Sequence, residues 1–149
     1  MNKTMGLERF LDVQANTYII ALEEVKNGRK MSHWMWYIFP QIVGLGTSSM
    51  SQYYGIRDIN EARAYLKHSV LSARLIEITT ELSKLTETNP TKIFGSIDAM
   101  KLKSCMTLFE FADEEGILFS KVLNKFYYGE RDIRTLKIVG SKSVKEKSL

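Results

Sequence analysis

Apolar side chains recur at every third or fourth position along most of this chain, and this spacing restricts it to a mainly helical fold. The first periodic stretch covers residues 7–25 and stops before Gly28, a residue type that commonly ends helices. One face of this predicted helix is formed by Leu7, Leu11, Gln14, Tyr18, Ala21 and Val25. A second stretch stops before Pro90, and its face is formed by Leu71, Leu75, Ile78, Leu82 and Leu85.

Further helices are predicted between and after these two stretches. Asp58 and Glu61 have the spacing of a capping box, which indicates that a helix starts there. Ser96 is expected to begin another helix, and Gly129 to end a later one. No stretch alternates apolar and polar residues over a useful length, and no Asn-Gly or Asp-Gly hairpin turn is present. The sequence therefore predicts an all-α fold, a single compact multihelical domain of about six to eight short helices.

The chain carries no sign of a second domain. Its 149 residues suffice for one hydrophobic core, and no Gly/Ser-rich linker interrupts them. We expect a single helical domain over residues 1–139. Residues 140–149, which include Lys142, Lys145 and Lys147, are expected to form a basic, disordered tail.

Charge and composition limit the partners of the chain. Half of the formal net charge of +4 lies in that tail, so no nucleic-acid partner is expected for the folded part. No membrane partner is expected either, because no apolar run approaches the roughly 20 residues of a spanning helix. The single cysteine, Cys105, excludes an internal disulfide and fits a reducing compartment, which predicts a cytoplasmic protein. The oligomeric state stays open.

The segment of residues 30–41 concentrates aromatic and polar side chains. They are Lys30, Ser32, His33, Trp34, Trp36, Phe39 and Gln41. A planar, charged ligand such as a nucleotide needs this combination, because rings stack on a base while polar groups hold phosphate or ribose oxygens. The alternative is that Trp36 and Phe39 fill the core, as buried aromatic residues often do.

His33 is a candidate for acid–base catalysis. An imidazole ordinarily titrates near neutrality, which suits a general acid or base. It could equally cap a helix or donate a hydrogen bond to a carbonyl group. One cysteine and two histidines, His33 and His68, offer no zinc-binding spacing, so neither a metal nor another cofactor is expected.

Polar residues also occur within the predicted helices. Gln14 and Tyr18 lie in the apolar face of the first helix, where a buried amide needs hydrogen-bond partners. A structural bond to a loop backbone is the favoured interpretation, and a polar pocket beside the helix is the alternative. A second polar face consists of Asp98, Lys101, Ser104 and Thr107, at three-residue steps. Exposure to solvent is its default interpretation, and a polar wall opposite the tryptophan segment is the alternative.

Several stretches resemble one bacterial protein family, known as domain of unknown function 1810. They read LERFLDVQANTY, GRKMSHWMWYIFPQIVGLG, EARAYLKHSVL, IFGSIDAMKLKSCMTLF and VLNKFYYGERDIRTL. The resemblance extends from about Leu7 to Leu136 and implies an all-helical fold. The biochemical function of the family is not known. The calpastatin label that some members carry implies nothing about the function of this chain. Family motif positions fall on every candidate site residue named above, and many are polar, as in a ligand pocket. In general character the chain is also similar to a helical superfamily that handles ADP-ribose derivatives, which is an analogy of fold alone.

These observations lead to a first functional hypothesis, a pocket for a nucleotide or an ADP-ribose-like molecule. Trp34 and Trp36 would form its aromatic walls, and Lys30 and Lys101 would meet phosphate charge. The ribose or base would contact Gln14, Ser32 and Gln41, with Tyr18, Ser104 and Thr107 as further ligand-binding candidates. If turnover occurs, hydrolysis of a glycosidic bond is expected, with His33 or Asp98 as the catalytic residue that transfers the proton.

Two alternatives come from other functional classes. The first is a non-catalytic protein that sequesters a signalling nucleotide, which predicts that the ligand is recovered unchanged. The second is a protein–protein adaptor that uses the aromatic segment as a partner groove. The adaptor predicts an exposed apolar patch of roughly several hundred Å² in place of a pocket.

Overall fold

The computed structural model describes residues 4–148 of the chain and the side chains of residues 6–140. Within this range it contains nine helices and no strand, which confirms the predicted all-α fold. The longer helices are α1 (Thr4–Lys26), α4 (Ile59–Lys67), α5 (Ser69–Lys84), α7 (Ser96–Ala112), α8 (Ile117–Tyr127) and α9 (Ile133–Ser148). The short ones are α2 (Met35–Ile38), α3 (Ser49–Tyr54) and α6 (Pro90–Phe94).

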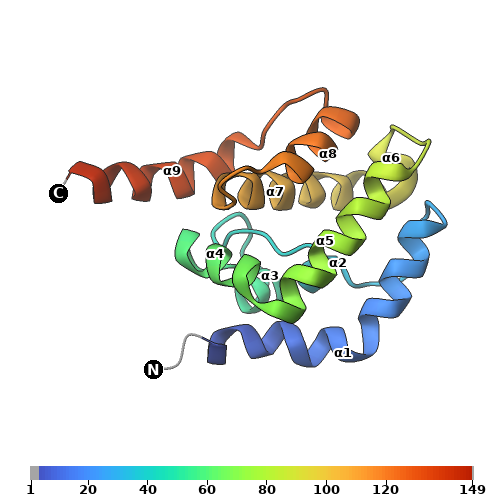
Figure 1. Cartoon of the computed structure of the whole chain (residues 1–149), viewed down its shortest axis with the longest axis horizontal. Coiled ribbons are helices and arrows are strands. Elements are labelled where there is room, and N and C mark those ends of the chain that lie inside the picture. The colour runs from blue at the N-terminus through green and yellow to red at the C-terminus, as the bar shows by residue number, and fades with distance from the viewer. Residues whose placement is uncertain (1–3, 149) are drawn as a thin grey trace.

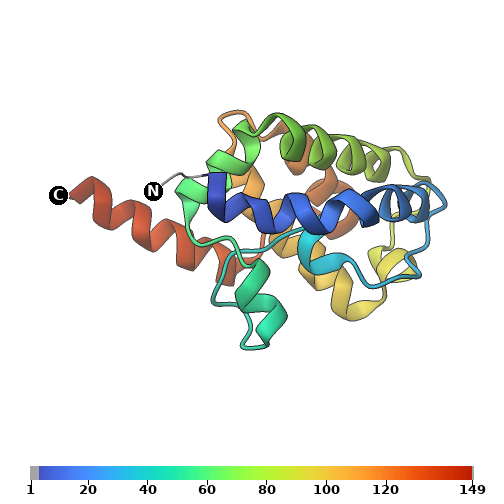
Figure 2. The same cartoon turned by 90° about the horizontal axis from the view of Figure 1, so that it is seen from below.

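The helices form one body in which α1 and α7 lie on opposite sides (Figure 1). Between them run α4 and α5, and α5 packs against both α1 and α8. The helices α8 and α9 pack against α7. Helix α9 extends past the rest of the molecule (Figure 2).

Polar side chains cap the starts of α4 and α5, and the sequence predicts the first of these caps. Asp58 Oδ1 accepts a hydrogen bond from Glu61 N at 2.8 Å and thereby caps α4. The Glu61 carboxylate does not return to Asp58 and instead accepts from Arg57 N at 3.1 Å. His68 Nδ1 caps α5 by accepting from Val70 N and Leu71 N, each at 3.2 Å.

Aromatic side chains connect the helices through the core. Phe10 of α1 packs edge-on against Tyr65 of α4, with ring centroids 5.3 Å apart. Tyr65 meets Phe109 of α7 at 5.3 Å, and Phe109 meets Phe119 of α8 at 5.9 Å. Rings that touch in this way stabilise the fold beyond the area they bury. The four rings therefore link both sides of the molecule in one continuous row.

Helix α9 runs to Ser148, but the side chains of residues 141–149 and all of Leu149 lie outside the described part, so the predicted disordered tail stays a prediction. Among the described residues, no helix combines the length and the apolar character needed to cross a membrane.

Candidate functional site

The turn before α2 is organised by one carboxylate, Glu24, near the end of α1. Glu24 Oε1 accepts hydrogen bonds from Met31 N at 2.8 Å, Ser32 N at 2.9 Å and Trp34 Nε1 at 2.8 Å. Its Oε2 accepts from Ser32 Oγ at 2.6 Å. Burial raises the pKa of Glu24, but these four bonds outweigh it and lower that pKa to about 2. Ser32 and Trp34 are thus held in place by a structural carboxylate.

Two lysines and one aspartate connect this turn to α7. Asp98 Oδ2 lies 2.9 Å from Lys30 Nζ, and Asp98 Oδ1 lies 3.2 Å from Lys101 Nζ. Each ammonium group also lies over a tryptophan ring, Lys30 over Trp34 at 5.1 Å and Lys101 over Trp36 at 3.9 Å. Cation–π contacts of this kind hold the ammonium groups in position. Asp98 therefore joins the two lysine–tryptophan pairs.

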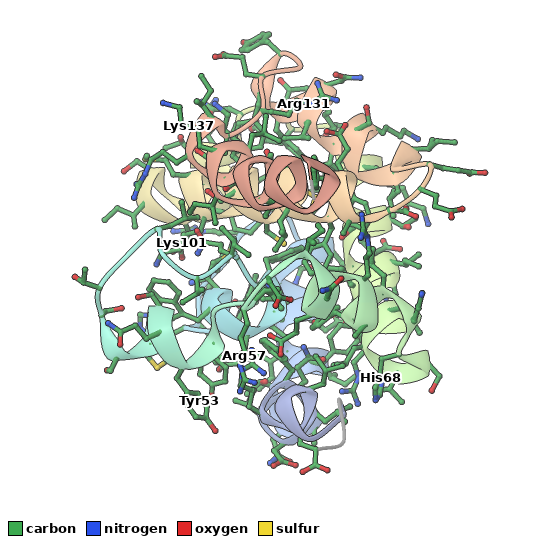
Figure 3. All side chains as sticks on the ribbon, turned by 90° about the vertical axis from the view of Figure 1, so that its left-hand side faces the viewer. Tyr53, Arg57, His68, Lys101, Arg131 and Lys137 are labelled. Carbon is green, nitrogen blue, oxygen red and sulfur yellow. The ribbon has the colours of Figure 1, made fainter. Side chains whose placement is uncertain are left out.

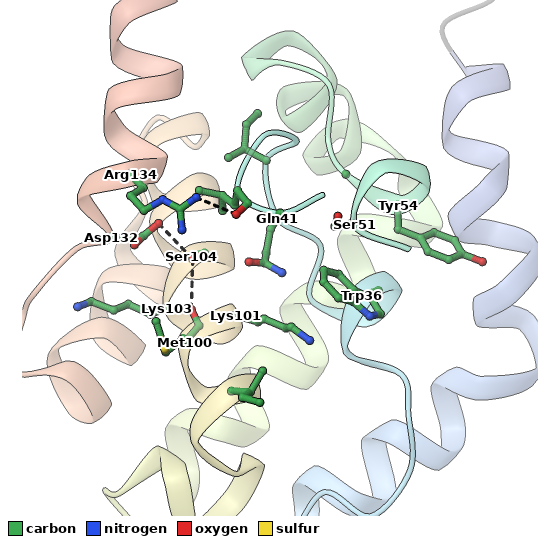
Figure 4. Close-up of a pocket in the computed structure, with 15 residues that line it drawn as sticks. Trp36, Gln41, Ser51, Tyr54, Met100, Lys101, Lys103, Ser104, Asp132 and Arg134 are labelled. Atoms are coloured by element: carbon green, nitrogen blue, oxygen red, sulfur yellow. Dashed lines mark hydrogen bonds between the residues drawn. The ribbon is translucent and has the colours of Figure 1, made fainter. Parts of the chain in front are cut away.

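A cavity of about 330 Å³ opens beside Trp36 (Figure 4). Its walls come from α7, from the start of α9 and from the segment that precedes and includes α3. In the view of Figure 4 the Gln41 amide lies between the Trp36 ring and the Arg134 guanidinium. The lining residues are Trp36, Gln41, Ile42, Leu45, Gly46, Ser51, Tyr54, Gly55, Ile97, Met100, Lys101, Lys103, Ser104, Asp132 and Arg134.

One wall of the cavity is an excursion of the chain over residues 43–55, closed at its base. Val43 N donates to Ile56 O at 2.8 Å, and Ile56 N donates to Gln41 O at 2.8 Å. The backbone at Gly55 lies so close to the backbone at Ser51 that a Cβ on Gly55 would be 2.6 Å from Ser51 O. A glycine is therefore required where the 43–55 excursion rejoins the body.

Arg9 of α1 fixes the same excursion from outside. Its Nε donates to Tyr53 O at 2.8 Å and its Nη2 to Gly55 O at 2.9 Å. Nη2 also pairs with Glu61 Oε1 of α4 at 2.6 Å. A guanidinium has enough donors to hold all three acceptors at once. The cavity wall is thus tied to α1 and α4 as well as to its own base.

The opposite wall is the junction of α7 with α9. Asp132 precedes α9, and its Oδ2 accepts from Ser104 Oγ and Thr135 N, each at 3.1 Å, and from Thr135 Oγ1. Asp132 N donates to Thr107 Oγ1 at 2.9 Å. Arg134 and Leu45 both line the cavity, and Arg134 Nη2 donates to Leu45 O at 2.7 Å. These bonds fix the first turn of α9 against α7.

The structure brings together four of the residues that the sequence predicts for ligand binding. Trp36, Gln41, Lys101 and Ser104 all line the cavity, although they come from two segments some 60 positions apart in the chain. Figure 3 shows Lys101 on the side of α7 that faces the segment carrying α3. For the polar face of α7, the alternative interpretation of the sequence is a polar wall opposite the tryptophan segment. Lys101 and Ser104 of that face form such a wall in the cavity.

Gln14 and Tyr18 do not line this cavity, and both link α1 to other elements. Gln14 Nε2 donates to Tyr37 O at 2.8 Å and to Tyr65 Oη at 3.0 Å. Tyr18 Oη donates to Glu77 Oε1 at 2.5 Å and lies 3.0 Å from Arg74 O. Burial, then the bond to Glu77, raises the pKa of the Tyr18 phenol. Both side chains therefore have structural partners.

The other predicted residues also lie outside the cavity. Lys30 and Asp98 form the ion pair described above, and Trp34 is only 1% exposed, with its ring packed against Phe39 and Phe94. The Thr107 hydroxyl donates to Lys103 O and orders the start of α9. His33, one of the two catalytic candidates, is exposed and is not part of the cavity wall.

Helix α9 contributes Arg134 to the cavity wall, a residue that the sequence motifs do not indicate. Arg134 is the second residue of that helix, and the helix dipole disfavours a cation in the first turn. This mismatch is a weak signal in the sequence, because an arginine at a position unfavourable for the helix can have a local role. Among the described side chains, no three His, Cys, Asp or Glu residues gather closely enough to hold a metal ion.

Comparison with known proteins places the chain in a family. It matches the family described as "Protein of unknown function (DUF1810)" over residues 4–139, and it belongs to that family. Its structure is similar to the crystal structure of the conserved hypothetical protein Rv1873 from Mycobacterium tuberculosis, with a TM-score of 0.88 and 42% sequence identity. The match covers 90% of this chain and 96% of that one. No curated protein matches the chain. The resemblance read from the sequence motifs is therefore confirmed.

Proposed function

We propose that the cavity beside Trp36 binds a small anionic molecule with a planar ring, of the nucleotide or ADP-ribose-like class. The observation that carries this proposal is the convergence of Trp36, Lys101 and Gln41 on one cavity from separate parts of the chain. A ring, a cation and an amide are the groups that a base, a phosphate and a ribose need.

The charge of the cavity supports an anionic ligand. Three cationic side chains, Lys101, Lys103 and Arg134, line it. The carboxylate of Asp132 also lines it, and Asp98 pairs with Lys101 from outside the wall, so the positive groups still outnumber the negative ones. Oδ2 of Asp132 already accepts hydrogen bonds from Ser104 and Thr135, so it helps to build the wall. A cavity with more positive than negative groups attracts anions and retains them through charge-assisted hydrogen bonds.

The size and the mouth of the cavity support a small organic ligand. Ligand pockets generally have volumes of about 300–1,000 Å³, and this cavity lies near the lower limit. Ile97 and Met100, two lining residues on α7, are 70% and 71% exposed. Exposed apolar side chains beside polar ones suit a ligand with an apolar ring and a polar end. The adaptor hypothesis expected a flat apolar face in this region, and the cavity favours a small molecule over it.

Binding without turnover is the form of this function that the geometry supports best. Both catalytic candidates lie outside the cavity wall, His33 in an exposed position and Asp98 between two lysines. Hydrolysis of a glycosidic bond stays a prediction, and sequestration of a signalling nucleotide is the function that fits a cavity of this kind without either residue.

A thermal-shift screen tests the proposal. The purified protein is incubated with nucleotides, NAD, ADP-ribose and cyclic signalling nucleotides, and each ligand is then analysed by mass spectrometry. We expect at least one ligand to raise the melting temperature and to be recovered intact. A change in its mass would instead establish turnover and identify the bond that breaks.

A matched pair of variants locates the binding. Lys101→Met removes a cation from the cavity wall, whereas Lys121→Met removes one from an exposed position on α8. The stabilisation by the ligand should fall in Lys101→Met and persist in Lys121→Met. Absence of any shift in the wild-type protein, or equal loss in both variants, would refute the proposed site.

A further inference from the structure

We infer that Arg134 holds the anionic group of the ligand, so that a nucleoside phosphate lies with its phosphate at α9 and its base at Trp36. This inference rests on the proposed function and adds the orientation of the ligand in the cavity. It assigns the phosphate to a residue of the last helix, which none of the sequence arguments selected for binding.

Arg134 has hydrogen-bonding capacity to spare. Its guanidinium group carries five N–H donors, and its Nη2 donates to Leu45 O at 2.7 Å. Among the described side chains, no carboxylate lies within 4.0 Å of the guanidinium to form an ion pair. The bond to Leu45 holds the group at the cavity and uses one of its five N–H donors.

The other two cations of the cavity are engaged elsewhere. Lys101 pairs with Asp98 Oδ1 at 3.2 Å, and its Nζ lies 3.9 Å from the centre of the Trp36 ring. The amino end of Lys103 points away from Gln41 in Figure 4 and lies over the Tyr127 ring at 5.9 Å. Lys103 therefore lines the cavity mainly with its aliphatic stem. The guanidinium of Arg134 is the cation best placed to meet an anion.

The positions of Gln41, Trp36 and Asp132 indicate how the ligand is oriented in the cavity. In Figure 4 Arg134 and Trp36 lie on opposite sides of the Gln41 amide. Asp132 lines the cavity as well, two positions before Arg134 in the chain, and its carboxylate repels an anion. A phosphate therefore approaches Arg134 from the Gln41 side, which places the sugar near the amide and the base near the tryptophan.

The chemistry of the guanidinium group makes a phosphate its preferred partner. Two parallel N–H groups match two phosphate oxygens, and such bidentate pairs are among the strong hydrogen bonds of proteins. A lysine would supply the charge without this geometry. Loss of a charge-assisted interaction of this kind should weaken binding about 10- to 100-fold.

Isothermal titration calorimetry at fixed ionic strength tests the assignment. The probes are the four nucleoside 5′-monophosphates, the corresponding nucleosides and inorganic phosphate. The variants are Arg134→Gln, Arg134→Lys and, as a matched control, Lys137→Gln, which removes an exposed cation three residues further along α9 (Figure 3). Circular dichroism melting curves establish that each variant is folded.

We expect a monophosphate to bind the wild-type protein and to bind Arg134→Gln about 10- to 100-fold more weakly, with Arg134→Lys between them. The affinity for the nucleoside should be equal in wild type and Arg134→Gln, and Lys137→Gln should behave as wild type. Undiminished monophosphate binding by Arg134→Gln, or the same loss in Lys137→Gln, would overturn the inference and leave the proposed function intact. If no nucleotide binds the wild-type protein, the proposed function fails and this inference fails with it.

Discussion

Replacing Glu24 with glutamine removes the negative charge around which the turn before α2 is assembled. The amide oxygen can occupy the position of Oε1 and keep the bonds from Met31 N, Ser32 N and Trp34 Nε1. The amide nitrogen can donate to Ser32 Oγ, whose hydroxyl rotates to suit. The variant therefore preserves the shape of the site and tests the contribution of the charge.

The lowered pKa of Glu24 gives the size of that contribution. A fall from the ordinary value of 4.5 to about 2 corresponds to at most about 3 kcal/mol of stability at neutral pH. Glu24 is partly exposed, and screening by solvent reduces this to about 1–2 kcal/mol. Glu24→Gln should therefore lower the melting temperature by about 2–8 °C at pH 7.

The sign of the pH dependence follows from the direction of the shift. Because the folded-state pKa is lowered, the stabilisation is fully present above pH 4.5 and is lost as the pH falls through about 2. Roughly half of it should be lost at pH 3. Glu24→Gln has no carboxylate to protonate at this site, so its stability should fall less than that of the wild type between pH 7 and pH 3.

Thermal melting at pH 7 measures the first effect, and urea unfolding at pH 7 and pH 3 measures the second. Glu23→Gln is the matched control, since Glu23 is the exposed neighbour of Glu24 on α1 and its replacement changes the net charge equally. If wild type and Glu24→Gln lose the same free energy of unfolding between the two pH values, the hydrogen-bonded carboxylate does not stabilise the turn and the reasoning is wrong.

Two further substitutions and one labelling reaction test the packing. Gly55→Ala should lower the free energy of unfolding by about 1–3 kcal/mol in chemical denaturation, because the new Cβ would lie 2.6 Å from Ser51 O; unchanged stability would contradict the close approach. Gly140→Ala places a Cβ in open space within α9 and should raise the stability by up to about 1 kcal/mol; a loss comparable to that of Gly55→Ala would contradict it. Cys105 is fully buried, and burial raises the pKa of its thiol, so a thiol reagent should modify it only after unfolding; rapid labelling of the native protein would show that α7 opens.

The helices were predictable because their signals are local. Apolar residues recur with a period of 3.6 in the sequences of α1 and α5, which predicts one buried face on each helix. In the structure, four residues of the predicted α5 face are fully or almost fully buried, namely Leu71, Leu75, Ile78 and Leu82. The start of α4 follows from Asp58 alone, since a helix cap involves only the residues next to it.

The site was less predictable because its contacts join distant parts of the chain. Arg134 meets Leu45, 89 positions earlier, and no pattern in either segment indicates this contact. The roles of Trp34 and Trp36 differ for a related reason. The four-residue helix α2 is too short for a periodicity that would separate a core ring from a cavity ring, and only the packing of Trp34 against Phe39 and Phe94 does so.

Nuclear magnetic resonance of the ¹⁵N-labelled wild-type protein tests the central claim most directly, because the two tryptophans report from inside and outside the cavity. On titration with a nucleotide, the indole N–H resonance of Trp36 and the side-chain amide of Gln41 should shift. The indole of Trp34, which donates to Glu24 and is buried, should stay in place. Shifts at Trp34 without Trp36, or no shift at either indole at saturating nucleotide, would contradict a nucleotide-binding cavity beside Trp36.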